Sequence, residues 1–328
     1  MFVSVVVVTK NEEQNISPCI ESILAQNYPR DEYEVIIIDG GSTDRTQEIV
    51  RRYPVKLIVA DRAIIGYQRN IGVRNAQGGY VAFTDADCVA DREWLRKLVK
   101  GLEDRESGVV AVGGPNLVFE SDPDFARVVG YMQETFAGSG GSAQSRAIRK
   151  ARYVKSIPNC NIIYRADALK SGKYDDRLSC GDDSDINYRL AKRGYKFLYL
   201  PDAVVWHHRP ANLKAFVKKM FSYGEGMARV TRKNSNVVRW YAFVAALMVI
   251  GIVIAYPLIR FVPFAVYVYL GGGAIYIGAL CVSTVQVFLR FRSVESVKTL
   301  ILLPMQHMCY GVGFLKGMVF PRLGRDTE

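Results

Sequence analysis

The apolar residues of this chain are unevenly distributed, and this constrains its fold more than any other feature. Trp240–Ile259 carries no charge over about twenty residues, enough for a helix to cross the hydrocarbon core of a bilayer. Val262–Leu289 is longer and equally uncharged, so a helix there can span at a tilt. Leu300–Val319 is also apolar, but a proline, a histidine and a lysine interrupt it. We predict a membrane region of about three helices over residues 237–328. Core helices of a soluble protein are the alternative, and the length of the first two stretches argues against it.

Basic residues surround these apolar stretches. The formal net charge is +11, which in a soluble protein suggests a polyanionic partner such as nucleic acid. No zinc-finger, homeodomain or RNA-binding signature is visible, so the membrane surface is the expected partner and nucleic acid is not. Residues 211–236 alternate apolar and basic side chains at helical spacing, which predicts a helix lying on an anionic leaflet. A surface helix packed on the globular domain is a compatible alternative.

The cysteines and the chain start bear on the cellular compartment. The six cysteines form no C-x-x-C pair, and their spacing supports neither a zinc site nor a disulfide framework, which fits a reducing compartment. The apolar run that begins at Val3 stops at Lys10, too early for a cleavable signal. The loop from Arg290 to Lys298 is basic, as is the stretch before Trp240. The positive-inside rule therefore predicts an integral membrane protein with a cytoplasmic globular domain.

Residues 1–210 alternate between short β-branched runs and helical patterns. Such alternation on short loops predicts an α/β fold with a doubly wound, mostly parallel sheet. The expected strands are 3–8, 34–38, 56–59, 81–83, 162–164 and 196–200, and the expected helices are about 16–24, 45–53, 66–76 and 91–102, with another after Asp185.

A loop rich in glycine and serine, Ala137–Ser145, interrupts this pattern and leads into a basic segment. One interpretation is a mobile lid that brings cations to a phosphate. The other is a solvated linker with a charged face. The basic residues are Arg146, Arg149, Lys150, Arg152 and Lys155.

The strand Val81–Phe83 ends in two acidic residues, Asp85 and Asp87. The carboxyl edge of an open α/β sheet is where ligands bind. Two carboxylates so close repel each other unless a cation lies beside them, and Mg2+ or Mn2+ takes carboxylate oxygens together with phosphate oxygens. The pair therefore indicates a metal-bridged diphosphate site, and an Asp-rich turn is the alternative.

Four motifs in order resemble those of the family 2 glycosyltransferases, which are inverting enzymes with the GT-A fold. The motifs are Val8–Glu12, Ile38–Asp44, the D-x-D segment Thr84–Asp87, and Gly181–Asp185, in which Asp182 stands where the family usually has glutamate. The resemblance covers about residues 1–210. It implies a Rossmann-like GT-A catalytic domain over 1–210, an interfacial helix region over 211–236 and transmembrane helices over 237–328.

The resemblance also implies site residues. Thr9, Glu12 and Asp39 are expected to hold the nucleoside, and Arg69 to lie in the nucleotide site. Asp87 is expected to ligate the metal, and Asp85 to contact ribose or metal-bound groups. The full set implied for donor binding is Thr9, Glu12, Asp39, Arg69, Asp85, Ala86 and Asp87. The set implied for the metal is Asp87, Asp85 and His207, although a structural role for His207, or ligation by His208 instead, stays open.

Inversion requires a base opposite the leaving group. Asp183 is the candidate, with Asp182 as the alternative, and acidic residues that only stabilise a helix N-terminus are the non-catalytic interpretation. The implied reaction is metal-dependent transfer of a sugar from a nucleotide-diphosphate sugar to a membrane-linked acceptor, with a polyprenyl or dolichyl carrier as the expected kind. The alternatives are a processive polysaccharide synthase and a non-catalytic, membrane-anchored sugar-nucleotide binding protein. The sugar, the nucleotide base, the acceptor and the oligomeric state are not determined by the sequence.

Overall fold

The computed structural model describes residues 1–103, 108–142, 150–237 and 240–320. The chain forms two compact units. The α/β unit contains Met1–Leu117 and Arg146–His208, and the helical unit contains Val118–Ser145 and Arg209–Arg322. The grouping of residue 118 onward with the C-terminal helices was not indicated by the sequence. Arg146 and Arg149 of the proposed lid lie outside the described residues, so the lid stays a prediction.

The α/β unit is built on an eight-stranded mixed sheet with the order β3-β2-β1-β4-β9-β6-β10-β8. The first four strands are parallel, as are β6 and β10, whereas β9 and β8 run antiparallel to their neighbours. This confirms the predicted α/β fold with a mostly parallel sheet. The strands are β1 (Val3–Thr9), β2 (Tyr33–Asp39), β3 (Lys56–Val59), β4 (Tyr80–Asp85), β6 (Val109–Gly113), β8 (Arg152–Val154), β9 (Ile162–Arg165) and β10 (Lys196–Tyr199). A smaller sheet has the order β5-β11-β7, from Cys88–Ala90, Val205–His207 and Asn116–Leu117.

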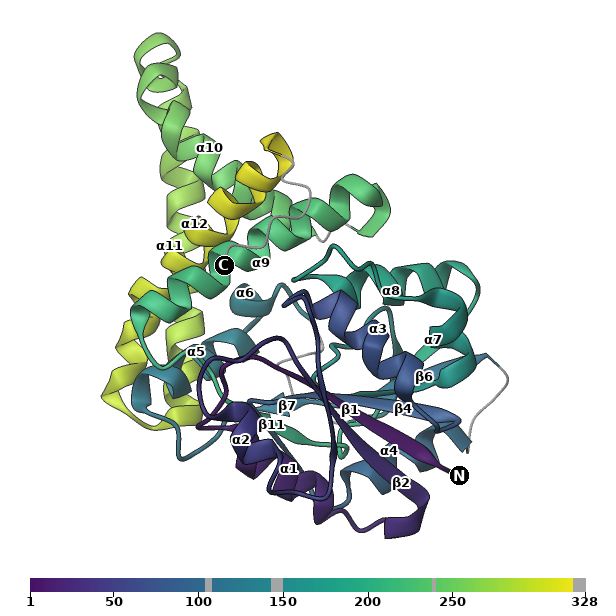
Figure 1. Cartoon of the computed structure of the whole chain (residues 1–328). Coiled ribbons are helices and arrows are strands. Elements are labelled where there is room, and N and C mark those ends of the chain that lie inside the picture. The colour runs from purple at the N-terminus through teal and green to yellow at the C-terminus, as the bar shows by residue number, and fades with distance from the viewer. Residues whose placement is uncertain (104–107, 143–149, 238–239, 321–328) are drawn as a thin grey trace. The chain divides into compact units, whose positions relative to one another are not determined.

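Helices cover both faces of the large sheet (Figure 1). Alternate side chains of a strand point to opposite faces, so Val5 and Val7 of β1 join one core while Val6 and Val8 join the other. The first core also takes side chains of α1 (Ile16–Leu24), α2 (Thr46–Val50) and α4 (Trp94–Glu103). The second takes side chains of α3 (Ile65–Asn75), α7 (Ala166–Gly172) and α8 (Asp182–Lys192). A Cβ at Gly72 would lie 2.4 Å from Val6, so glycine allows α3 to approach β1 closely.

Short 3-10 helices lie at Arg30–Glu32, Ser235–Val237 and Val294–Lys298.

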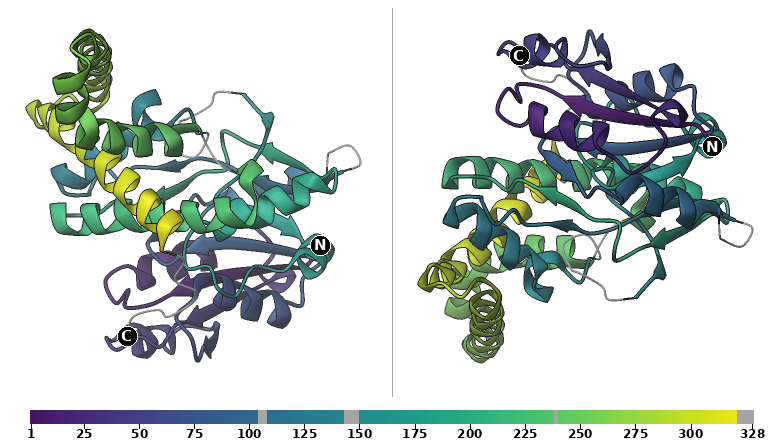
Figure 2. Two further views of the ribbon diagram at one scale, coloured as in Figure 1. Left: turned by 90° about the horizontal axis from the view of Figure 1, so that it is seen from above. Right: turned by 90° about the horizontal axis from the view of Figure 1, so that it is seen from below.

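The helical unit contains α5 (Asp124–Glu134), α6 (Phe136–Ser139), α9 (Leu213–Lys233), α10 (Trp240–Phe261), α11 (Ala265–Phe291) and α12 (Thr299–Val319). The side chain of Asn212 caps α9 by accepting a hydrogen bond from the backbone N–H of Ala215 at 3.0 Å. In Figure 2, α12 (yellow) lies across α9. A Cβ at Gly224 would stand 2.1 Å from the carbonyl oxygen of Tyr310, so the two helices pack with their backbones in close approach.

The expected membrane helices differ in how well they suit a bilayer. Within the described residues, Ala265–Phe291 is the helix long and apolar enough to cross a membrane, and Trp240–Ala255 is a shorter apolar stretch. The third expected segment does form a helix, but α12 does not meet this criterion. It contains Pro304 and Lys316 and buries one face inside the helical unit, including Leu303 and Phe314.

Candidate active site

The carboxyl ends of three neighbouring parallel strands bring the first site residues together. In the register of the sheet, Thr9 of β1 pairs with Asp39 of β2, and Val8 pairs with Asp85 of β4. The motifs that the sequence predicted at strand ends therefore meet at one edge, as the ends of parallel strands must. Thr9 is 5% exposed, and its hydroxyl has no hydrogen-bond partner among the described residues.

The Asp39 carboxylate organises the turn that follows β2. One oxygen accepts hydrogen bonds from the backbone N–H groups of Gly41 and Ser42, at 3.0 and 2.9 Å, and from the side chain of Gln47 at 2.8 Å. Gly41 has a φ of 76°, which favours glycine. Asp39 thus fixes the backbone of the predicted nucleotide-binding turn.

Glu12 lies in the loop after β1, which forms hydrogen bonds with the segment that follows β2. Its backbone N–H donates to the Thr46 hydroxyl at 2.8 Å, and its carboxylate accepts from the Asn15 amide at 2.7 Å. Asn11 accepts from the backbone N–H of Thr43 at 2.8 Å. These contacts hold the loop after β1 against the loop after β2. The residues predicted to bind the nucleoside therefore lie at the same edge of the sheet.

Arg69 connects two acidic motifs that are far apart in the sequence. It lies on α3 and is 5% exposed. Its guanidinium forms an ion pair with Asp182 and another with Asp85, the latter at 3.1 Å. Burial alone would lower the pKa of Arg69, but Asp182 and Asp85 raise it well above its usual range. A permanently charged guanidinium therefore bridges the D-x-D segment and the start of α8.

The D-x-D segment lies beside His207. The small sheet pairs β11 with β5, which sets His207 opposite Cys88 and next to Asp87. The distance from Nε2 of His207 to Oδ2 of Asp87 is 3.1 Å, and the backbone N–H of His208 donates to the Asp87 carbonyl at 3.0 Å. The Asp87 carboxylate and the His207 imidazole thus lie side by side, with Asp85 two residues earlier in the chain, and carboxylate oxygen and imidazole nitrogen are donors that suit a divalent cation.

The Asp85 carboxylate has a raised pKa. Burial raises the pKa of Asp85, Arg69 lowers it, and Cys160 and Asp87 add to the rise, which brings the pKa to about 7. Of its side chain, 31% is still accessible. A carboxylate kept partly accessible yet poorly solvated gains most from a bound cation.

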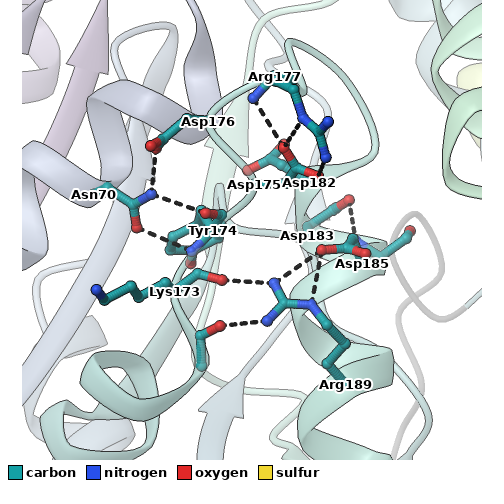
Figure 3. Close-up of polar contacts among 12 residues, drawn as sticks. Asn70, Lys173, Tyr174, Asp175, Asp176, Arg177, Asp182, Asp183, Asp185 and Arg189 are labelled. Carbon is teal, nitrogen blue, oxygen red and sulfur yellow. Dashed lines mark hydrogen bonds and ion pairs between the residues drawn. The ribbon is translucent and has the colours of Figure 1, made fainter. Parts of the chain in front are cut away.

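Three aspartates, Asp182, Asp183 and Asp185, lie in the first turn of α8 (Figure 3). Asp182 is bound by Arg69, and Asp185 forms an ion pair with Arg189 at 2.8 Å. Asp183 is half-buried and accepts a hydrogen bond from the backbone N–H of Ser184 at 2.6 Å. Arg69 links this cluster to the D-x-D segment through its ion pairs with Asp182 and Asp85.

The structure also assembles a group that the sequence did not indicate. Cys88, Cys160 and His207 are buried, and their ligand atoms lie within 4.8 Å of one another. Their positions are far apart in the chain, and no C-x-x-C spacing marks them. The pairing of β5 with β11 was needed to find the group.

Comparisons with known proteins identify relatives of this chain. The chain is 25% identical over 331 residues, 97% of each protein, to dolichyl N-acetyl-alpha-D-glucosaminyl phosphate 3-beta-D-2,3-diacetamido-2,3-dideoxy-beta-D-glucuronosyltransferase of Methanococcus voltae. It is 29% identical over 237 residues to glycosyltransferase AglE of Haloferax volcanii, covering 70% of this chain and 74% of AglE.

Solved structures show the same fold. Mannosyltransferase PcManGT of Pyrobaculum calidifontis, in complex with GDP-Man and Mn2+, has a TM-score of 0.62 at 22% identity, covering 91% of this chain and 86% of PcManGT. S. aureus TarS 1–349 with UDP-GlcNAc has a TM-score of 0.53 at 20% identity, covering 97% and 91%. These likenesses identify the α/β unit as a GT-A fold. Residues 4–170 match the family described as Glycosyl transferase family 2, and the chain therefore belongs to that family and is a glycosyltransferase.

Proposed function

We propose that this protein transfers a sugar, with inversion and in the presence of a divalent metal, from a nucleotide-diphosphate sugar to a polyprenyl-linked acceptor at a membrane. The observation that carries the proposal is the contact of Asp87 with His207 just beyond the end of β4, where Asp85 lies, with Arg69 linking Asp85 to the acidic start of α8. The donor rim comprises Thr9, Glu12, Asp39, Arg69, Asp85, Ala86 and Asp87.

The cation would be held by Asp87, Asp85 and His207. When bound, it offsets the negative charge that develops on the leaving nucleotide diphosphate. The carboxylates accept Mg2+ or Mn2+, and an imidazole nitrogen favours Mn2+, because Mg2+ takes oxygen ligands. PcManGT, which shares this fold, is in complex with Mn2+, and this supports a divalent metal here.

Asp183 is the proposed base. Its neighbours Asp182 and Asp185 are 4% and 0% exposed, whereas Asp183 is half-buried and keeps surface that an acceptor can reach. Its carboxylate would take the proton of the acceptor hydroxyl as that oxygen bonds to the anomeric carbon and the bond to the diphosphate breaks. Asp182, held by Arg69, would position the helix start and remains the alternative base.

The acceptor and the membrane setting rest on the helical unit and on a relative. The Methanococcus voltae relative, which matches nearly the whole chain, acts by its name on a dolichyl-linked sugar phosphate. An apolar helix such as α11 would keep the enzyme beside such a carrier. We place the GT-A domain over 1–210 on the cytoplasmic side, the interfacial region over 211–236 and the membrane region over 237–328.

Purified full-length protein, screened with nucleotide sugars, tests this function. We expect one class of nucleotide sugar to raise the melting temperature with Mn2+ and to lose its sugar to a polyprenyl-diphosphate- or polyprenyl-phosphate-linked saccharide. Mass spectrometry should show addition of a single residue. A ladder of products would indicate the processive synthase instead, and transfer to water-soluble acceptors alone would contradict the lipid-linked acceptor.

A further inference from the structure

Two cysteines and a histidine form a compact buried group beside the candidate active site. Cys88 is 1% exposed, Cys160 is 4% exposed and His207 is 7% exposed. One ligand atom from each lies within 4.8 Å of the other two. A tetrahedral ion with bonds of about 2.3 Å to sulfur holds two sulfurs about 3.8 Å apart, so the group needs shifts of at most about 1 Å to surround an ion.

The surrounding structure holds these side chains in place. Strand pairing sets Cys88 opposite His207. Cys160 stands between Asn159 and Asn161, whose side chains are buried and hydrogen-bonded, and the amide of Asn116 lies 3.2 Å from the Cys160 sulfur. Ligands supported in this way lose little conformational freedom when an ion binds.

We infer that Cys88, Cys160 and His207 form a binding site for a thiophilic divalent cation such as Zn2+. Thiolate sulfur and imidazole nitrogen select such ions over Mg2+ and Mn2+. Each thiol releases its proton to solvent as its sulfur bonds to the ion, and no electron is transferred. The Asp87 carboxylate, with one oxygen 3.1 Å from His207 and the other 3.9 Å from the Cys88 sulfur, or a water completes the coordination.

Binding of a thiophilic ion at this group should also affect sugar transfer, and this expectation rests on the proposed function. His207 and Asp87 belong to both the thiophilic group and the proposed Mn2+ site. An ion bound by the two sulfurs takes His207 away from the catalytic cation. Zn2+ should therefore inhibit sugar transfer at concentrations far below those of Mn2+, and serine at either cysteine should relieve the inhibition.

Binding is tested with Co2+ as an optical substitute for Zn2+, on full-length protein kept reduced by a phosphine. We expect sulfur-to-cobalt charge-transfer absorption in the near ultraviolet, saturating at one equivalent and removed by excess Zn2+. Cys88→Ser and Cys160→Ser should each lower this absorption at least fivefold. Cys180→Ser, in the same unit but outside the group, should leave it unchanged. No such absorption, or equal absorption in all variants, would overturn the inference.

A measurement on the unsubstituted protein tests the site even if the cysteine variants fail to fold. X-ray absorption of the Zn2+-loaded protein should show two sulfur neighbours at about 2.3 Å. A shell of oxygen and nitrogen alone would overturn the site. In the transfer assay with Mn2+, the half-inhibitory Zn2+ concentration should rise at least tenfold in Cys88→Ser and Cys160→Ser. If the protein bound no nucleotide sugar, the proposed function would fail while the sulfur signals remained, so the two failures are distinguishable.

Discussion

The two units of this protein both bury apolar cores, but they differ in the charged groups that they bury and the apolar groups that they expose. In the α/β unit, charged groups such as Arg69, Asp182 and Asp185 are almost fully buried at one sheet edge and its adjoining helices. In the helical unit, large apolar side chains remain exposed, with Phe261 at 82% and Ile275 at 77%. A water-soluble domain rarely exposes so many. The first unit thus keeps charged groups in its interior, while the second exposes apolar surface, as the membrane region that we propose requires.

The largest effect is expected at the proposed base of the α/β unit. Asp183→Asn should lower the rate of sugar transfer by roughly 10²–10⁴-fold, because general-base catalysis contributes about that much. Binding of the nucleotide sugar, measured by thermal shift, should change little. Asp167→Asn is the matched control, since Asp167 is exposed and paired with Arg165. Full activity of Asp183→Asn on a hydroxyl acceptor would exclude this residue as the base.

The buried ion-pair network should affect stability next. Arg69→Met leaves Asp182 and Asp85 without their shared guanidinium, and losing one partner of a buried pair lowers stability by about 3–5 kcal/mol. Denaturant unfolding in the absence of metal measures this. Arg52→Met removes an exposed pair with Glu48 and should leave stability nearly unchanged. Similar losses in both variants would show that the buried network has no special role.

Cysteine labelling compares the two units directly. Cys281 is an exposed residue of α11, and Cys180 is a partly exposed residue of the α/β unit. In native membrane vesicles with the catalytic side outward, a water-soluble maleimide should modify Cys180 at least tenfold faster than Cys281, and detergent should remove most of the difference. Rapid modification of Cys281 before detergent is added would mean that α11 faces water.

The smallest effect concerns glycines within the helical unit. A methyl group at Gly224 would stand 2.1 Å from the Tyr310 carbonyl, whereas a methyl at Gly251 meets nothing within 4 Å. Gly224→Ala should therefore destabilise the α9–α12 packing by about 1–3 kcal/mol. Gly251→Ala should be neutral or slightly stabilising, because alanine favours a helix. Thermal unfolding in detergent tests the pair, and equal effects would argue against close helix contact.

Much of the α/β unit follows from local sequence. The β-branched runs ending at Thr9, Asp39 and Asp85 predicted both the strands and the edge where they meet, because parallel strands align their carboxyl ends. The exact helix bounds did not follow, and α2 ends at Val50 rather than Tyr53 because the last residues leave the helical hydrogen-bond pattern.

Contacts between distant segments could not be read from the sequence. The pairing of Arg69 with Asp182 and the gathering of Cys88, Cys160 and His207 depend on strand order and register, which local patterns do not encode. Hydropathy also could not show that the glycines and one buried face of α12 pack against α9.

Calorimetry of nucleotide-sugar binding tests the proposed metal site most directly. The preferred nucleotide sugar is titrated into the native protein and into Asp87→Ala, each with Mn2+ and with a chelator. We expect saturable binding to the native protein only when Mn2+ is present, and an affinity at least tenfold lower in Asp87→Ala. Equal affinity in the chelator, or undiminished Mn2+-dependent binding by Asp87→Ala, would contradict a cation held at this sheet edge.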